Sequence, residues 1–235
     1  MARATLLLLH AFPLDARMWE DVRARLPGRP VLAPTLPLPP DAGTMEEWAD
    51  DVLALTEAPV VPVGVSMGGY LAFELWRRAS ERVPALVLAD TRAEPEPAEG
   101  RETRDRTIVE IREGGADALW RGLEDRVLAP GAPRGVRGRA RELALGRDPD
   151  DLVAMVEAIR DRADSSGTVA TIDVPALVVV GEEDALVPLA DAGGLANALP
   201  GGRLRVIPGA GHLAPLERPE SFAAVVSAFL DEVGT

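Results

Sequence analysis

The residue most able to do chemistry in this sequence is a serine set among glycines. Ser66 lies in the segment Gly64-Val65-Ser66-Met67-Gly68-Gly69, which follows an apolar run and precedes a helical pattern. Glycines two positions before and after a serine, at a strand-to-helix turn, are typical of a nucleophile whose hydroxyl is exposed by a strained backbone. The motif alone is only moderately specific, so a glycine-rich structural turn is the alternative to a nucleophile.

A serine nucleophile needs a base within hydrogen-bond reach, and the sequence offers few candidates. It contains two histidines, His10 and His212. His212 lies in a glycine-rich loop after the last apolar run, and catalytic groups of open α/β sheets gather at the carboxyl ends of strands. We therefore predict that His212 is the base. We expect His10 to brace its loop rather than to exchange protons with substrate.

A carboxylate must orient the histidine base and stabilise its imidazolium form. The segment Gly181-Glu182-Glu183-Asp184, directly after the fifth apolar run, supplies three carboxylates. We predict that Asp184 is the acid and that Glu182 and Glu183 lie in solvent. Asp90, which closes the fourth apolar run, is the main alternative.

Donors for the negative charge on the attacked carbonyl are predicted in two places. The N–H of Met67 follows the nucleophile directly, and the N–H of Phe12 lies in the loop after the first apolar run. Pro13 has no N–H to donate and holds the residue before it extended. The side chains of Phe12, Met67 and Trp120 are our candidates for contact with substrate.

Six short apolar runs alternate with helical patterns along the chain. Because most runs are continuously apolar, they predict strands covered on both faces, as in a parallel sheet flanked by helices. The predicted strands are Thr5–Leu9, Pro30–Ala33, Val60–Gly64, Ala85–Ala89, Ala176–Val180 and Leu204–Ile207. The helices between and after them are Asp15–Leu26, Thr44–Leu55, Met67–Ser80, Leu189–Leu199 and Pro219–Val233. This order predicts an α/β fold with a doubly wound sheet.

One region breaks the alternation of strands and helices. No convincing strand occurs between about Arg92 and Thr168, where apolar residues recur at three- and four-residue spacing. Helices are predicted there at Glu102–Arg112, Ala116–Leu128, Val136–Leu145 and Pro149–Arg162. We interpret residues 92–167 as a helical cap inserted into a core of residues 1–91 and 168–235. Ordinary crossover helices are the alternative, although four helices in one crossover would be excessive.

Composition excludes several classes of function. The formal charge of −13 argues against nucleic acid or an anionic membrane surface as a partner. The absence of lysine rules out a P-loop or Schiff-base lysine, and the absence of cysteine rules out disulfides and thiolate metal sites. We therefore expect neither a cofactor nor a metal. The first apolar run is too short for a signal peptide, so we expect a cytoplasmic protein. We also expect a monomer or small homo-oligomer whose partner is a small-molecule ester.

Taken together, the motifs resemble the α/β-hydrolase fold superfamily over the whole chain. The resemblance is carried by His10-Ala11-Phe12-Pro13, Gly64-Val65-Ser66-Met67-Gly68-Gly69, Gly181-Glu182-Glu183-Asp184 and Gly211-His212. Within the superfamily the chain is most similar to small capped serine esterases and 3-oxoadipate enol-lactonase-like hydrolases. Ala11 replaces the usual glycine. Because Met1 lies almost on the first strand, a sheet of about six strands without the family's N-terminal hairpin is expected.

The resemblance implies ester hydrolysis, because related dehalogenases and epoxide hydrolases have aspartate where this chain has Ser66. We predict a carboxylesterase that forms an acyl-enzyme on Ser66 and prefers short to medium acyl esters. Alternatives are an enol-lactone hydrolase, a cofactor-free perhydrolase or haloperoxidase, and a non-catalytic ligand-binding protein on the same fold. Arginines of the helical region are compatible with a carboxylate-bearing substrate, but we interpret them as a solvated helix face balanced by acids. They are Arg121, Arg126, Arg134, Arg137, Arg139 and Arg141.

Overall fold

A single parallel sheet organises the molecule. The computed structural model describes residues 4–38 and 43–235. Six strands lie in the order β2-β1-β3-β4-β5-β6, and every neighbouring pair is parallel. They are β1 (Thr5–Leu9), β2 (Val31–Leu32), β3 (Val60–Val65), β4 (Leu86–Ala89), β5 (Ala176–Gly181) and β6 (Gly202–Ile207). The predicted α/β fold with about six strands is confirmed.

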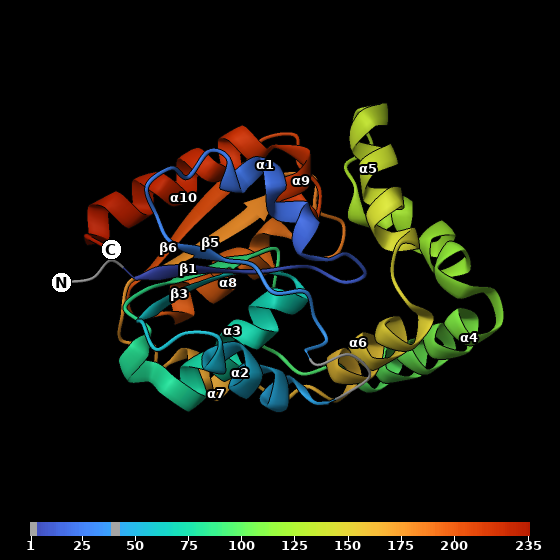
Figure 1. Ribbon diagram of the computed structural model, residues 1–235, viewed down its shortest axis with the longest axis horizontal. Coiled ribbons are helices and arrows are strands. Elements are labelled where there is room, and N and C mark those ends of the chain that lie inside the picture. The colour runs from blue at the N-terminus through green and yellow to red at the C-terminus, as the bar shows by residue number, and fades with distance from the viewer. Residues whose placement is uncertain (1–3, 39–42) are drawn as a thin grey trace.

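Helices cover both faces of this sheet, with α1, α9 and α10 on one side and α2 and α3 on the other (Figure 1). The alternating side chains of β1 show why both faces are apolar. Leu6 and Leu8 pack in the cluster that includes Phe222 of α10, whereas Leu7 and Leu9 pack with Phe73 of α3. The helices outside the β4–β5 connection are α1 (Glu20–Arg23), α2 (Met45–Ala54), α3 (Met67–Ala79), α8 (Leu189–Ala198), α9 (Ala214–Glu217) and α10 (Pro219–Val233).

Local signals in the sequence account for some helix boundaries and not for others. Thr44 caps α2 in a capping box with Glu47, as its residue spacing suggests. The predicted helix Asp15–Leu26 is wrong in extent. A 3-10 turn at Ala16–Trp19 precedes the single helical turn of α1, because Asp15 accepts from the N–H of Arg17 and starts the tighter turn.

Helices alone fill the connection between β4 and β5. They are α4 (Ala98–Val127), α5 (Arg134–Leu145), α6 (Pro149–Asp161) and α7 (Ser166–Val169). We call α4, α5 and α6 the helical insert, which stands to one side of the sheet in Figure 1, and in it α4 packs against both α5 and α6. Two helices predicted separately run together as α4. At Gly115 the backbone kinks, with φ 64° and ψ −164°, a conformation that only glycine adopts readily.

The parallel arrangement places the carboxyl ends of all six strands at one edge of the sheet. The loops after β1, β3, β5 and β6, which carry the predicted site residues, therefore converge. No helix in the described parts of the chain combines the length and apolarity needed to span a membrane.

Candidate active site

Ser66 occupies a strained turn between β3 and α3. Its backbone has φ 53° and ψ −112°, a conformation that non-glycine residues rarely adopt. Glycines on either side allow the turn. A Cβ on Gly64 would lie 2.2 Å from the carbonyl oxygen of Gly68, and a Cβ on Gly68 would lie 2.2 Å from that of Leu9. The local sequence therefore folds as the motif predicts, with the serine at the apex of a tight strand-to-helix turn.

A continuous hydrogen-bonded chain links three of the predicted residues. Nε2 of His212 lies 2.8 Å from Oγ of Ser66, and Nδ1 of His212 lies 2.8 Å from Oδ2 of Asp184. The other carboxylate oxygen of Asp184 accepts from the N–H groups of Leu186 at 2.7 Å and Val187 at 3.0 Å. With Nδ1–H donated to Asp184, the lone pair of Nε2 faces the serine hydroxyl, which is the tautomer that a base requires.

Asp184 is buried but remains ionised. Burial acts to raise its pKa, yet the hydrogen bond from His212 and those from the N–H groups of Val187 and Leu186 outweigh burial and lower the pKa below its usual value. Glu182 and Glu183, the two other carboxylates of this loop, are exposed. The structure therefore brings only Asp184 of the three to the histidine.

Asp90, the alternative acid, directly follows β4 and has a positive φ of 46°. Its Oδ1 accepts from the N–H of Gly181 at 2.8 Å, and its Oδ2 has no partner among the described residues. Complete burial and the nearby charge of Asp184 raise the pKa of Asp90 well above its usual value. Asp90 makes no hydrogen bond to His212, so the structure places it behind the acid rather than at the base.

Glu217 is a site residue that the sequence analysis missed. Its buried carboxylate accepts from the N–H groups of Gly211 at 2.9 Å and Leu213 at 3.3 Å, the two neighbours of His212. It also accepts from the N–H of Ala129, which follows the end of α4, at 2.9 Å. Burial raises the pKa of Glu217. One side chain thus holds the loop of the base against the helical insert, and a lone glutamate carries no sequence signal for such a role.

The loop after β1 is held by His10. Nδ1–H of His10 donates to the carbonyl of Ala11 at 3.1 Å, and Nε2 accepts from the N–H of Leu36 at 2.8 Å. Burial lowers the pKa of His10 to about 4, so the ring is neutral and serves as a brace.

Phe12, the residue after Ala11, is buried, and its N–H has no partner in the described part of the chain. Met67 opens α3, where the first N–H groups lack partners within the helix. Neither N–H group is taken by another partner among the described residues, and their role as oxyanion donors stays a prediction.

A cavity of about 300 Å³ reaches the hydroxyl of the serine and the ring of the base. It is lined by Ser66, Tyr70, Arg92, Glu96, Arg104, Arg126, Arg162, Ala185, Leu186, Val187 and His212. The three predicted substrate-contacting side chains are not among them. Phe12 and Met67 are buried in one core cluster and Trp120 in the other. The structure brings none of these three side chains to this cavity.

The arginines of the helical insert divide into two groups. Our interpretation of a solvated face balanced by acids holds for Arg121, Arg137, Arg139 and Arg141, each of which pairs with a carboxylate. Arg126 and Arg134 are exposed but pair with no described carboxylate, so the interpretation holds for them only in part, and Arg126 also lines the cavity beside the serine. The sequence could not separate this residue from the others, because the kink at Gly115 decides which way the end of α4 points.

Within residues 4–38 and 43–235, no group of three or more histidine, aspartate or glutamate side chains could hold a metal ion. The groups that meet at the cavity are a serine hydroxyl, the imidazole hydrogen-bonded to it, and the carboxylate behind that imidazole.

The model of the alpha/beta hydrolase family matches residues 6–225. The pimeloyl-[acyl-carrier protein] methyl ester esterase of Neisseria meningitidis is 30% identical over 239 residues, covering 96% of this chain and 93% of that protein.

Two solved structures illustrate the structural similarity. A thermophilic esterase from Thermogutta terrifontis, determined with malate bound, has a TM-score of 0.94 and 32% identity, covering 99% of this chain and 91% of that chain. The enol-lactonase from Burkholderia xenovorans LB400 has a TM-score of 0.84 and 25% identity, covering 98% of this chain and 92% of that chain. The similarity thus extends over the whole fold.

Proposed function

The chain belongs to the alpha/beta hydrolase family and is an ester-hydrolysing enzyme, and we propose that it cleaves its ester through an acyl-enzyme on Ser66. One observation carries this proposal. The chain of hydrogen bonds from Asp184 through His212 to Ser66 has 2.8 Å at each link to the imidazole. A serine at a strained turn with a base in contact is the arrangement that nucleophilic catalysis needs.

Acylation follows from this arrangement. Oγ of Ser66 attacks the ester carbonyl carbon while its proton moves to Nε2 of His212. The negative charge that develops on the carbonyl oxygen is stabilised by the N–H groups of Phe12 and Met67. The ionised Asp184 stabilises the imidazolium. When the carbon–oxygen bond to the alcohol breaks, His212 returns the proton to the departing oxygen.

Deacylation repeats the same steps with water. Nε2 of His212 takes a proton from a water molecule, whose oxygen attacks the acyl carbon on Ser66. Collapse of the second tetrahedral intermediate breaks the acyl–Oγ bond. The proton returns to Oγ, and the carboxylic acid leaves. No cofactor is needed for either half of the cycle.

The helical insert acts in this proposal as a cap that limits the substrate. The cavity at Ser66 has a volume of about 300 Å³, and α4 contributes Arg104 and Arg126 to its wall. A space of this size supports a preference for short to medium acyl esters. A long acyl chain would have to extend beyond it.

Removal of the nucleophile tests the mechanism. Ser66→Ala should lower kcat/KM for ethyl butanoate roughly a thousand-fold or more, because acylation has no alternative nucleophile. The matched control is Ser80→Ala, which changes an exposed serine just past the end of α3. Both variants should keep the circular dichroism spectrum of the parent.

Labelling by a fluorophosphonate gives an independent readout of the same serine. The parent and Ser80→Ala should be labelled, and Ser66→Ala should not. Wild-type turnover by Ser66→Ala would contradict the mechanism. A folded parent protein that neither labels nor hydrolyses esters would instead favour the non-catalytic binding protein.

A further inference from the structure

The cavity beside Ser66 carries an excess of positive charge. Four of its lining residues are arginines, namely Arg92, Arg104, Arg126 and Arg162, whereas Glu96 is the single carboxylate among them. The chain as a whole has a formal charge of −13. The cavity beside the nucleophile is therefore rich in positive charge although the protein as a whole is acidic.

Two of these arginines are occupied by the protein itself. The guanidinium of Arg162 forms an ion pair with Glu96, donates to the carbonyl of Glu94 at 3.0 Å, and lies 4.3 Å from the centre of the Tyr70 ring. Arg92 donates to the carbonyl of Leu186. These contacts hold the two side chains in the wall of the cavity and leave them fewer donors for a ligand.

The other two arginines have donors to spare. Nη2 of Arg104 lies 3.6 Å from Glu96, whose carboxylate already pairs with Arg162, and Nε of Arg104 is buried with no partner in the described part of the chain. Arg126 is exposed and forms no hydrogen bond or ion pair with any of the described residues. The buried, unpaired Nε of Arg104 carries a free-energy cost that a bound anion would remove.

The kink in α4 brings these two arginines to one cavity. Arg104 lies on the leg of α4 before Gly115, and Arg126 lies on the leg after it, one residue before the helix ends. In a straight helix, residues so far apart in the sequence would be about 33 Å apart along the axis. The bend of α4 at Gly115 therefore assembles the pair.

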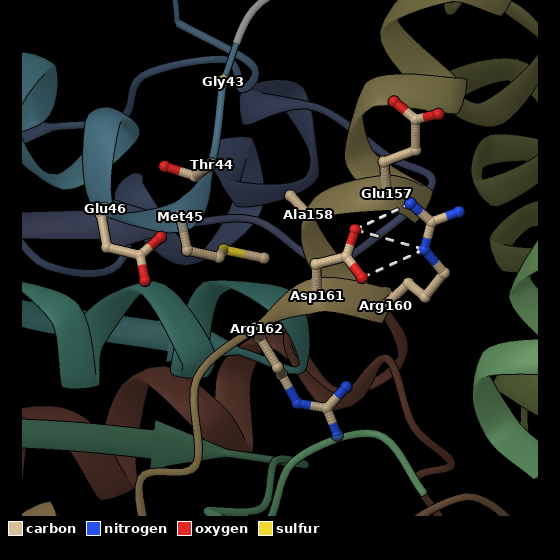
Figure 2. A pocket seen from close by; sticks show the side chains of 9 residues that line it. All are labelled: Gly43, Thr44, Met45, Glu46, Glu157, Ala158, Arg160, Asp161 and Arg162. Atoms are coloured by element: carbon tan, nitrogen blue, oxygen red, sulfur yellow. Dashed lines mark hydrogen bonds and ion pairs between the residues drawn. The ribbon is translucent and has the colours of Figure 1, made fainter. Parts of the chain in front are cut away.

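In a neighbouring hollow, arginine is paired with carboxylates. Figure 2 shows the hollow between the start of α2 and the end of α6, where Arg160 lies against Asp161 and the side chain of Arg162 points away from both. Its lining includes three carboxylates, and Arg160 pairs with Asp161 and Asp105 at 2.7 Å each. The excess of positive charge thus belongs to the cavity that contains Ser66.

We propose that Arg104 and Arg126 form a subsite for a carboxylate of the substrate, so that the enzyme acts on esters that carry a free carboxylate. The proposal rests on ester hydrolysis at Ser66. The planar guanidinium fork matches a carboxylate in two parallel hydrogen bonds. A cavity of about 300 Å³ accommodates a short half-ester of a dicarboxylic acid, with the ester at Ser66 and the carboxylate at the arginines.

Paired substrates test the subsite. Monoethyl succinate, glutarate and adipate are each compared with the ethyl ester of the acyl chain in which a methyl group replaces the carboxylate. Hydrolysis is followed by titration of the released acid. We expect kcat/KM for at least one half-ester to exceed that of its uncharged counterpart by about tenfold or more, since a hydrogen bond to a charged group contributes a factor of that order.

Arginine variants assign the preference to these residues. Arg126→Gln and Arg104→Gln should each reduce the half-ester preference by about tenfold. The matched control is Arg121→Gln, on the same leg of α4 as Arg126, because Arg121 is exposed and pairs with Asp117. This control should keep the preference of the parent. A parent that hydrolyses the uncharged esters as well or better, or variants that slow both series alike, would overturn the subsite.

Binding separates this subsite from the reaction itself. In the Ser66→Ala background, glutarate should bind by calorimetry, and the added Arg126→Gln change should weaken binding by about tenfold. Glutarate binding without any ester hydrolysis in the parent would sink the proposed function and leave the subsite standing. Hydrolysis of uncharged esters without glutarate binding would do the reverse.

Discussion

At the scale of single residues, Asp90 and Asp184 are two buried carboxyl groups that follow adjacent strands, and their pKa values are shifted in opposite directions. Asp184 receives hydrogen bonds from Leu186, Val187 and His212, and its pKa is lowered. Burial and the charge of Asp184 raise the pKa of Asp90, whose Oδ2 has no partner among the described residues. Two like charges so close together are unfavourable, which favours the neutral form of Asp90 more than that of an ordinary aspartate.

This difference predicts a large loss of activity for the substitution at Asp184 and a small effect for the same substitution at Asp90. Asp184→Asn should lower kcat by roughly a thousand-fold to ten-thousand-fold, because the amide stabilises neither the required tautomer nor the imidazolium. Asp90→Asn should stay within about tenfold of the parent, because a neutral amide oxygen can still accept from the N–H of Gly181. The measurements are ester hydrolysis and thermal unfolding of both variants. If Asp90→Asn were as inactive as Asp184→Asn, the assignment of the acid would be wrong.

Which site residues can be predicted from sequence depends on how local their signal is. Ser66 stands in a glycine pattern that its own turn requires, and His212 is one of only two histidines. Asp184 was one of three neighbouring acids, and only its burial against Leu186 and Val187 separates it from the rest. Arg126 could not be predicted, because its place at the cavity depends on a bend eleven residues away.

At the scale of elements, the close approach of α3 to β1 positions the nucleophile. The Cα of Gly68 faces the backbone of Leu9 so closely that a Cβ would lie 2.2 Å from its carbonyl oxygen. No rotamer change can relieve a contact with backbone. The glycine is thus required by packing between two elements, and the helix that starts at Met67 cannot approach the strand without it.

A methyl group at this contact should separate the two elements. We expect Gly68→Ala to lower the free energy of unfolding by more than about 2 kcal/mol and to reduce labelling of Ser66 by a fluorophosphonate. Gly193→Ala, in helix α8, has no atom within 4 Å of the added Cβ and is the matched control. It should change stability by no more than about 1 kcal/mol. Equal stabilities of the two variants in urea unfolding would contradict the packing argument.

Elements whose pattern is local were predicted well. The bounds of β1 and α10 agree with the prediction, because one is a continuous apolar run and the other starts at a proline and ends before a left-handed glycine. The predicted bounds of β6 were two residues short, because Gly202 and Arg203 join the sheet only through pairing with β5. Pairing with a distant strand does not change the spacing of apolar residues within a short segment, so the sequence of that segment does not reveal it.

At the scale of the whole molecule, hydrogen bonds connect the helical insert to the core. Arg147, between α5 and α6, donates to the carbonyl of Leu36 at 2.6 Å. The N–H of Leu36 donates to His10, and His10 donates to Ala11, the residue before Phe12. A series of buried contacts thus runs from the insert to the predicted oxyanion donor, and any loss within it should loosen both ends.

His10 makes this connection sensitive to acid, because burial lowers its pKa to about 4 from an unfolded value near 6.5. Above pH 6.5 the ring is neutral in both states, so its contribution to stability is complete. As the pH falls from 6.5 to 4, the unfolded chain binds a proton that the folded protein does not, and the free energy of unfolding should fall by roughly 3 kcal/mol. Urea unfolding across this range measures the loss.

His10→Gln, which cannot titrate, should be less stable at pH 7 but should lose roughly 3 kcal/mol less on acidification. An equal acid loss in the parent and the variant would show that His10 accepts a proton without strain, and the buried connection would then not depend on its neutral ring.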